Sequence, residues 1–221
     1  MARIRSFEAP HKGLRNIIGK FSFCLGYSNL ADPVQLAHLK QLGHEMFTLL
    51  NDHVHTENEH TLKHLEERVK GAAAHDMADH EELEAIQDAL EQRLSALTGS
   101  EPADLIHSFC LDFSLFHSRY LEHIFEEETV TELLLQQYFT DEELMEHRKG
   151  IMQKIAFPVM LLWLKYIIPA QRDEDSAAML AGLRANAPAD VFAQVLATIK
   201  VEMEADRFQR LVRKLSPEQN N

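Results

Sequence analysis

Two pairs of histidine and glutamate with identical spacing are the clearest candidates for metal ligands in the 221-residue chain. The first pair is His53 and Glu57, and the second is His123 and Glu127. Residues four positions apart on an α-helix lie on the same face, so each pair can direct an imidazole and a carboxylate toward one point. Imidazole nitrogen and carboxylate oxygen together form a ligand set that suits iron, manganese or zinc. The two pairs therefore predict a transition-metal site, provided that both face the same interior.

Helical phase indicates which of the candidate ligands face that interior. Each residue turns by about 100° around a helix, so a polar residue can be placed relative to the apolar stripe. His53 and Glu57 continue the apolar line of their helix within about 40°. His55 and Glu59 lie about 200° away from it and are expected to face solvent. The apolar line itself consists of Leu42, Met46 and Leu50.

The same test places histidines from three further helices inward. His123 and Glu127 lie on the apolar line of their helix, and His11 and His80 are each in phase with apolar residues of their own helices. The partners in phase with His123 are Phe109, Phe116, Val130 and Leu134; those of His11 are Leu14, Ile18, Phe21 and Leu25; those of His80 are Met77, Leu83 and Leu90. Four helices are thus expected to bring four histidines and two glutamates into one core.

Burying six ionisable groups in a dry core requires compensation. Each unpaired group would cost several kcal/mol, and no lysine or arginine is in phase with most of them. Divalent cations would compensate the buried carboxylates, and two carboxylates on facing helices can bridge two ions. The phasing therefore predicts one buried dinuclear metal site.

Apolar residues that recur at intervals of three and four predict helices along the chain, and no segment shows the alternation of a strand. Asp32 and Pro33 suit the N-cap and first position of the second helix. We expect an all-α fold, an antiparallel four-helix bundle with a C-terminal helical extension. The long helices are predicted at 8–25, 32–69, 76–97 and 100–138, and the shorter ones at 141–168 with a kink at Pro158, 173–185, 188–199 and 201–215.

Histidines are confined to the first two-thirds of the chain. Twelve of the thirteen lie at or before His123, and only His147 follows. We therefore expect a metal-binding bundle in residues 1–145 and a helical extension in residues 146–221.

The charge balance argues against several classes of partner. Twenty-two basic and 35 acidic residues give a net charge of −13, which disfavours binding to nucleic acid or to an anionic membrane. The amino terminus lacks the apolar segment of a secretory signal, and the apolar stretch 155–168 is too short to cross a membrane, so a cytoplasmic protein is expected. No phosphate-binding, nucleophile-elbow or dinucleotide motif is present.

The chain resembles a hemerythrin-like (HHE cation-binding) domain over roughly residues 8–140. The stretch around Trp163 and Ala187-Pro188 also resembles the helical tail that follows this domain in some bacterial members. The resemblance implies a non-haem di-iron centre that binds dioxygen or related small ligands, with Glu57 and Glu127 as bridging ligands and the four inward histidines as terminal ligands. It is carried by His11-Lys-Gly-Leu-Arg, His53-Val-His-Thr-Glu57, Asp79-His80-Glu-Glu-Leu and His123-Ile-Phe-Glu-Glu127.

One position departs from the pattern of the family. Oxygen-carrying hemerythrins have a second histidine four residues before the position of His80, where this chain has Asp76, with His75 beside it. We expect a weaker ligand or an open coordination position at that ion, and spacing does not decide between His75 and Asp76. His60, near the face of His53, is a further candidate ligand.

Several functions fit this site. The first is sensing, scavenging or storage of O2, NO or iron by two bound iron ions, with manganese and zinc as alternative metals. The second is a redox enzyme that reduces peroxide or delivers iron to damaged iron–sulfur clusters, and the third is a metal-free helical scaffold. A ferritin-like centre would need the Glu57-x-x-His60 unit twice, but Tyr120 stands three residues before His123. The last helices could cover the bundle or form a homodimer through Phe192, Val195, Leu196, Phe208 and Leu211.

Overall fold

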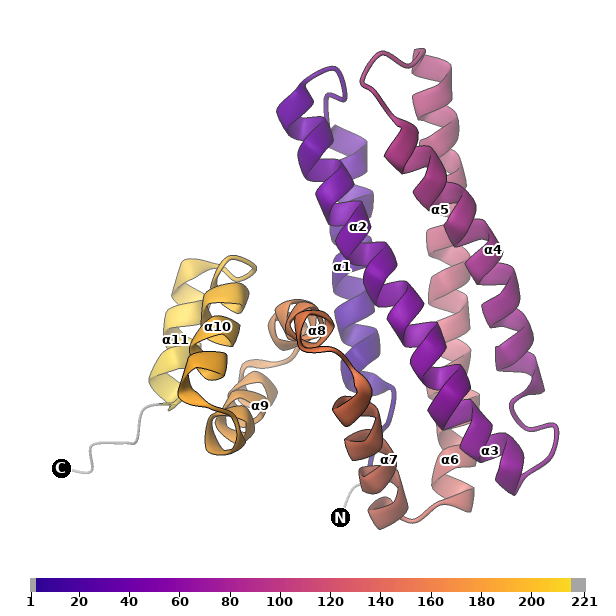
Figure 1. Ribbon diagram of the computed structural model, residues 1–221, viewed down its shortest axis with the longest axis vertical. Helices are drawn as coiled ribbons and strands as arrows, with labels where there is room; N and C mark the ends of the chain where they lie inside the picture. Colours follow the sequence, from indigo (N-terminus) through magenta and orange to yellow (C-terminus); the bar gives the residue numbers. More distant parts are fainter. Residues whose placement is uncertain (1–2, 216–221) are drawn as a thin grey trace.

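The long helices of the protein lie side by side, with their apolar faces turned toward a common core (Figure 1). The structure is a computed structural model that describes residues 3–215, and over this range it contains helices and no strands. Antiparallel neighbours pack into a helical bundle, which confirms the predicted all-α class. Its long helices are α1 (Glu8–Tyr27), α2 (Pro33–Thr56), α4 (Ala74–Ala96) and α5 (Ala103–Glu126).

The start of α2 follows the local sequence. Asp32 caps the helix, because its carboxylate accepts hydrogen bonds from the backbone N–H of Val34 at 2.8 Å and of Gln35 at 3.5 Å. Pro33 occupies the first turn, where a helix does not need its missing N–H. Both features agree with the prediction.

Both α2 and α5 continue into a π-helical turn. These turns are η1 (Glu57–Leu62) and η2 (Glu127–Thr131), and each begins at the inward glutamate of a His-x-x-x-Glu pair. The chain then returns to α-helix in α3 (Lys63–Arg68) and α6 (Glu132–Tyr138). The predicted helices 32–69 and 100–138 are therefore interrupted, which helical periodicity alone does not show. Single π turns inside α-helices often occur at functional sites.

The extra residue in each π turn moves the buried face by one position. On α5 the α-helical phase predicts Val130 and Leu134 inward, but Val130 is 49% exposed, whereas Thr131 and Leu135 are 2% and 1% exposed. A turn closed by i→i+5 hydrogen bonds holds one residue more than an α-turn, so the following side chains rotate around the axis. The prediction for Val130 is thus wrong for a defined geometrical reason.

The C-terminal part is built from shorter helices. The predicted kinked helix over 141–168 is wrong, because the chain leaves the helix at Ile155 and restarts with Pro158 in the first turn of the next one, where proline is tolerated. Thr140 and Glu143 form the capping box that starts this region. Its helices are α7 (Asp141–Lys154), α8 (Phe157–Ala170), α9 (Asp173–Asn186), α10 (Ala189–Lys200) and α11 (Ala205–Leu215).

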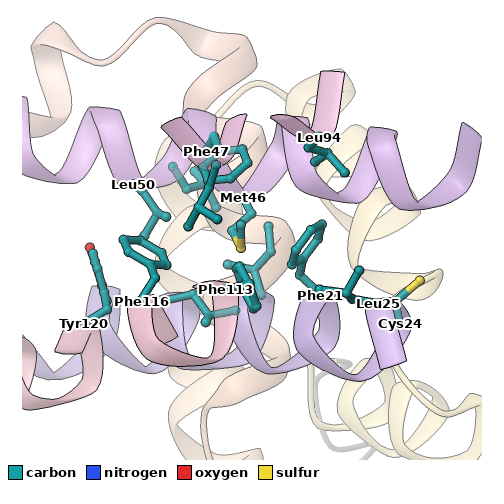
Figure 2. Packing of buried hydrophobic residues seen from close by; sticks show 14 of the residues in the cluster. Phe21, Cys24, Leu25, Met46, Phe47, Leu50, Leu94, Phe113, Phe116 and Tyr120 are labelled. Atoms are coloured by element: carbon teal, nitrogen blue, oxygen red, sulfur yellow. The ribbon is translucent and has the colours of Figure 1, made fainter. Parts of the chain in front are cut away.

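The main hydrophobic core joins the bundle to α8. Trp163 and Tyr166 of α8 belong to the same cluster of buried side chains as the inner residues of α1, α2, α4 and α5. Gly13 lets α8 approach closely, since a Cβ at this position would lie 2.8 Å from Ile167 Cγ1. Figure 2 shows part of this cluster, with Tyr120 at one edge. The inner residues of the bundle include Phe21, Met46, Phe47, Leu50, Phe113 and Phe116.

A second cluster lies among α8, α9, α10 and α11. Val195 and Leu211 are fully buried there, and Phe192, Leu196 and Phe208 are partly buried against them. The apolar residues of the last helices therefore pack largely on one another, and a homodimer stays a prediction. The division at residue 145, which lies inside α7, also stays a prediction. Among the described residues, no helix is long and apolar enough to cross a membrane.

Candidate metal centre

Six polar side chains meet in the interior of the bundle at the ends of α2 and α5. Each has at most 5% of its surface exposed. Their source elements are α1, α2, η1, α4, α5 and η2, so every long helix contributes an imidazole. The six are His11, His53, Glu57, His80, His123 and Glu127. The predicted inward direction of these residues is therefore confirmed, while His55 and Glu59 are exposed as expected.

Glu127 lies at the centre of the cluster. Its carboxylate oxygens lie 3.3 Å from His11 Nε2, 3.5 Å from His80 Nε2, 3.5 Å from His123 Nε2 and 3.9 Å from His53 Nε2. One carboxylate thus approaches imidazoles from all the long helices. Such a position suits a ligand that bridges two cations.

Glu57 approaches three of the same histidines from the other side. Its Oε1 lies 3.3 Å from His53 Nδ1 and 3.7 Å from His11 Nε2, and its Oε2 lies 3.5 Å from His80 Nε2. The two carboxylates and four imidazoles form two overlapping groups, within each of which the ligand atoms lie within 4.8 Å of one another. One group contains His53, His80, His123 and Glu127, and the other contains His11, His53, Glu57 and Glu127.

Most of the inward-facing polar atoms in this cluster lack hydrogen-bond partners. Eight buried nitrogen and oxygen atoms of the six side chains have none, among them both carboxylate oxygens of Glu127 and both ring nitrogens of His123. Buried polar atoms in proteins are normally satisfied, because an unsatisfied one costs about 1–3 kcal/mol. The separations above are too long or too poorly aligned to satisfy them. The donor set and its unused atoms fit metal ions.

The charges inside the cluster are strongly coupled. Burial lowers the pKa of His11, but the carboxylates of Glu127, Glu128 and Glu57 outweigh this effect and raise the pKa well above its usual value. His80 behaves similarly: burial opposes its charged form, but Glu127 and Glu57 raise its pKa to about 10. The carboxylates thus favour the protonated form of these two imidazoles, and a metal ion that bound there would displace a proton.

Burial decides the direction of the pKa shift at His53, His123 and Glu57, but not at Glu127. Burial lowers the pKa of His53 well below its usual value and also lowers the pKa of His123. Burial, together with the charge of Glu127, raises the pKa of Glu57 to about 7. Burial also opposes ionisation of Glu127, but His11 and His80 outweigh it and hold the pKa of this carboxyl well below its usual value. At His53 and His123 burial thus favours the neutral imidazole, which is the form that can ligate a metal ion.

Neighbouring groups orient two of the imidazoles. Glu128 Oε1 lies 3.0 Å from His11 Nδ1 and accepts a 2.6 Å bond from Arg15. Asn58 Oδ1 lies 2.9 Å from His80 Nδ1. Both contacts leave Nε2 directed at the carboxylates, which is how metal-binding histidines are commonly held.

The additional candidate residues lie outside the two buried groups. Asp76 is buried but accepts a 2.6 Å hydrogen bond from Thr131 Oγ1, and burial raises its pKa to about 6. His75 is exposed and lies 3.1 Å from Glu126, and His60 is half-buried. Met77, expected in phase with His80, is 40% exposed. Metal ligation by Asp76, His75 or His60 stays a prediction.

Sequence reasoning missed Tyr120 as part of this site. Its side chain is fully buried, its hydroxyl has no hydrogen-bond partner, and its ring centroid lies 6.3 Å from that of His53 and 6.1 Å from that of His123. A signal was present, since Tyr120 precedes Glu127 by seven residues and therefore shares its helix face. An aromatic ring on the buried face also fits an ordinary core position, so the sequence pattern alone does not assign a role to the hydroxyl.

Comparison with protein-family models, curated proteins and solved structures finds no match to this chain. The fold and the geometry above therefore define the protein as an all-helical chain with buried histidine and glutamate groups that could hold metal ions.

Proposed function

We propose that the six buried side chains hold two transition-metal ions, with iron as the metal, and that the protein is a di-iron binding protein of hemerythrin-like type. One observation carries this proposal, namely the eight buried nitrogen and oxygen atoms of these side chains that have no hydrogen-bond partner. A helical core without metal would gain by replacing such groups with apolar side chains. Manganese and zinc accept the same donor atoms, so metal analysis decides the identity.

The proposed roles of the residues follow from their contacts. Glu127 and Glu57 would be shared by the two ions, because each carboxylate approaches both His11 and His80. His11 would help to hold one ion and His80 and His123 the other, with His53 close to both groups. A bound iron pair would supply a redox-active centre with affinity for O2, NO or peroxide.

Tyr120 has a place in the same proposal. Its ring lies beside those of His53 and His123, and its buried hydroxyl has no partner, so it is suited to hydrogen-bond a small ligand. We therefore propose that the protein senses, scavenges or stores a small diatomic ligand or iron. Asp76 favours the redox-enzyme alternative. It stands where oxygen-carrying hemerythrins have a histidine, and its carboxylate accepts a hydrogen bond from Thr131, so an ion at His80 would have fewer imidazole ligands and an open position.

Metal analysis after anaerobic reconstitution with iron(II) tests the proposal. We expect about two iron ions per chain, and a change in the visible spectrum when O2, NO or peroxide is added. Fewer than one ion per chain would overturn it. Catalytic consumption of peroxide, or transfer of iron to an acceptor protein, would instead identify the redox enzyme.

The scaffold alternative is tested by removing both carboxylates. A Glu57→Ala, Glu127→Ala double variant should lose the metal, and its stability should no longer change when iron is added. If the parent also shows no change in stability with metal, the cluster is structural and the scaffold reading is correct.

A further inference from the structure

A large cavity lies between the bundle and the C-terminal helices and reaches the wall of the metal centre. Its volume is about 1020 Å³, at the upper end of the about 300–1,000 Å³ typical of sites for small organic molecules. The N-terminal segment, the start of α1, the end of α2, and α7, α8 and α9 surround it. In Figure 1 α7 and α8 lie beside the bundle in this region.

The inner wall of this cavity contains two members of the metal cluster. His53 and Glu57 both line it, although only 3% and 5% of their surfaces are exposed. Phe7 lines it as well, and the same ring stacks on His11 with a centroid separation of 5.2 Å. A molecule in the cavity would therefore touch the same side chains that face the metal ions.

Most of the remaining wall is apolar and adaptable. Ile151, Met152 and Ile155 come from the end of α7 and the turn after it, and Met160 and Trp163 come from α8. Met152 is 52% exposed, so part of this apolar surface is open to solvent in the absence of a ligand. Methionines suit sites that accept flexible apolar chains, because their own side chains adjust readily.

Five basic and four acidic side chains line the cavity. Several of them are engaged by partners: Arg3 pairs with Asp141, Arg172 pairs with Asp175, and Asp52 accepts a hydrogen bond from Trp163. Arg5 lies 3.6 Å from the carboxylate of Glu8. The charge of this carboxylate is already balanced by Lys12 at 2.6 Å, so Arg5 has no carboxylate to itself. Arg148 lines the cavity and forms no ion pair with the residues that the structure describes. Arg5 and Arg148 thus keep guanidinium N–H groups that no carboxylate of the described residues fully occupies. Guanidinium groups bind carboxylates well.

We propose that this cavity binds a medium-chain monocarboxylic acid, with its carboxylate at Arg5 and Arg148 and its apolar chain along Ile151, Met160 and Trp163, beside the inner wall that contains His53 and Glu57. Binding itself requires no metal. Contact between the bound acid and the metal centre rests on the proposed function above. The acid then occupies the side of the centre that the C-terminal helices cover, which gives these helices a role in ligand recognition.

Trp163 provides a direct measurement, because it lines the cavity and is the single tryptophan of the chain. Decanoate, added to the metal-free protein below its micellar concentration, should change the fluorescence of Trp163 with a saturable dependence. Octanoate should bind about 15-fold more weakly, since each methylene group contributes about fourfold. No saturable change, or equal binding of decylammonium, would overturn the proposal.

Matched variants test the two parts of the site. Arg148→Glu should weaken decanoate binding by about tenfold or more, while Lys149→Glu, one residue further along the same helix, should leave it unchanged. Ile151→Glu should abolish binding, whereas Met145→Glu, on an exposed part of the same helix, should not. Circular dichroism confirms that each variant is folded. Equal effects of a variant and its control would refute the assignment.

Contact with the centre is tested separately on protein loaded with cobalt(II). Decanoate should shift the visible absorption of the cobalt in the parent but not in Ile151→Glu. Saturable binding to the metal-free protein without this shift would refute the contact while leaving the binding site intact. Failure of cobalt or iron to bind would refute the proposed function. The fluorescence titration of the metal-free protein would still show whether the cavity binds decanoate.

Discussion

Replacement of Glu127 by glutamine is the sharpest test of how the six side chains work together. The variant keeps the volume of a fully buried residue but removes the one carboxylate that lies within 3.9 Å of all four imidazoles. We expect Glu127→Gln to lose most of the stabilisation by metal. The reason is that a neutral amide neither bridges two cations well nor balances their charge.

The size of the effect follows from binding linkage. A cation present at about 1,000 times its dissociation constant stabilises the folded state by about 4 kcal/mol. For a chain of this length about 1 kcal/mol shifts the Tm by about 2–4 °C, so each bound ion raises the Tm of the parent by about 8–16 °C. In the metal-free protein, Glu127→Gln also leaves His11 and His80 without their main carboxylate, which should destabilise it by about 3–5 kcal/mol.

Thermal unfolding with and without iron(II), under anaerobic conditions, measures both effects. Glu122→Gln is the matched control, because Glu122 lies on the same helix but is exposed. We expect the control to keep the metal-dependent rise in Tm, and Glu127→Gln to retain less than a quarter of it. A full rise in Glu127→Gln would refute the reasoning that this carboxylate joins the two groups of ligands.

Three further changes test other parts of the structure. Gly13→Leu should destabilise the protein by about 1–3 kcal/mol in urea unfolding, because its side chain would collide with Ile167, whereas Gly19→Leu faces open space and should cost less; equal effects would contradict the close packing. Tyr120→Phe should stabilise the metal-free protein by about 1 kcal/mol in the same assay, and a loss would show that the hydroxyl has a partner. Glu143→Gln should lower the Tm at pH 7 but not near pH 2. An arginine and the capping N–H hold the pKa of Glu143 at about 2, so the stability that its charge contributes is present above pH 4.5 and is lost as the pH falls through about 2. A difference in Tm that persists at pH 2 would exclude this electrostatic origin.

The direction of the six site residues could be predicted from the sequence because each lies on a long helix with regular apolar spacing or, like Glu57 and Glu127, directly follows one. His53 and Glu57, for example, extend the line of Met46 and Leu50 before the helical phase changes. On α2 and α5 the α-helical period predicts the buried face correctly up to the two glutamates, whereas on α4 it wrongly places Met77 inward, which is 40% exposed. Beyond Glu127 it fails, because no local signal in the sequence distinguishes a π turn from an α turn.

Other features depended on contacts between distant segments. The cavity is formed by Phe7, Ile151 and Trp163, which lie far apart in the sequence, so no local pattern could predict it. Pro158 does not distinguish a kink from a helix break in the sequence, since proline is compatible with both a bent helix and the first turn of a new one. The ring of Tyr120 satisfies the apolar pattern, so the pattern does not show that its hydroxyl belongs to the site.

The spread of the six side chains along the chain has a consequence for how the protein unfolds. His11 and Glu127 are separated by more than a hundred residues, yet they lie 3.3 Å apart. A cation held between them would act as a crosslink that closes a very long loop, and a link of this kind restricts the unfolded chain strongly. Protease resistance and slow unfolding would then depend on the ion, whereas the metal-free chain would open readily at the end of the bundle that carries the two glutamates.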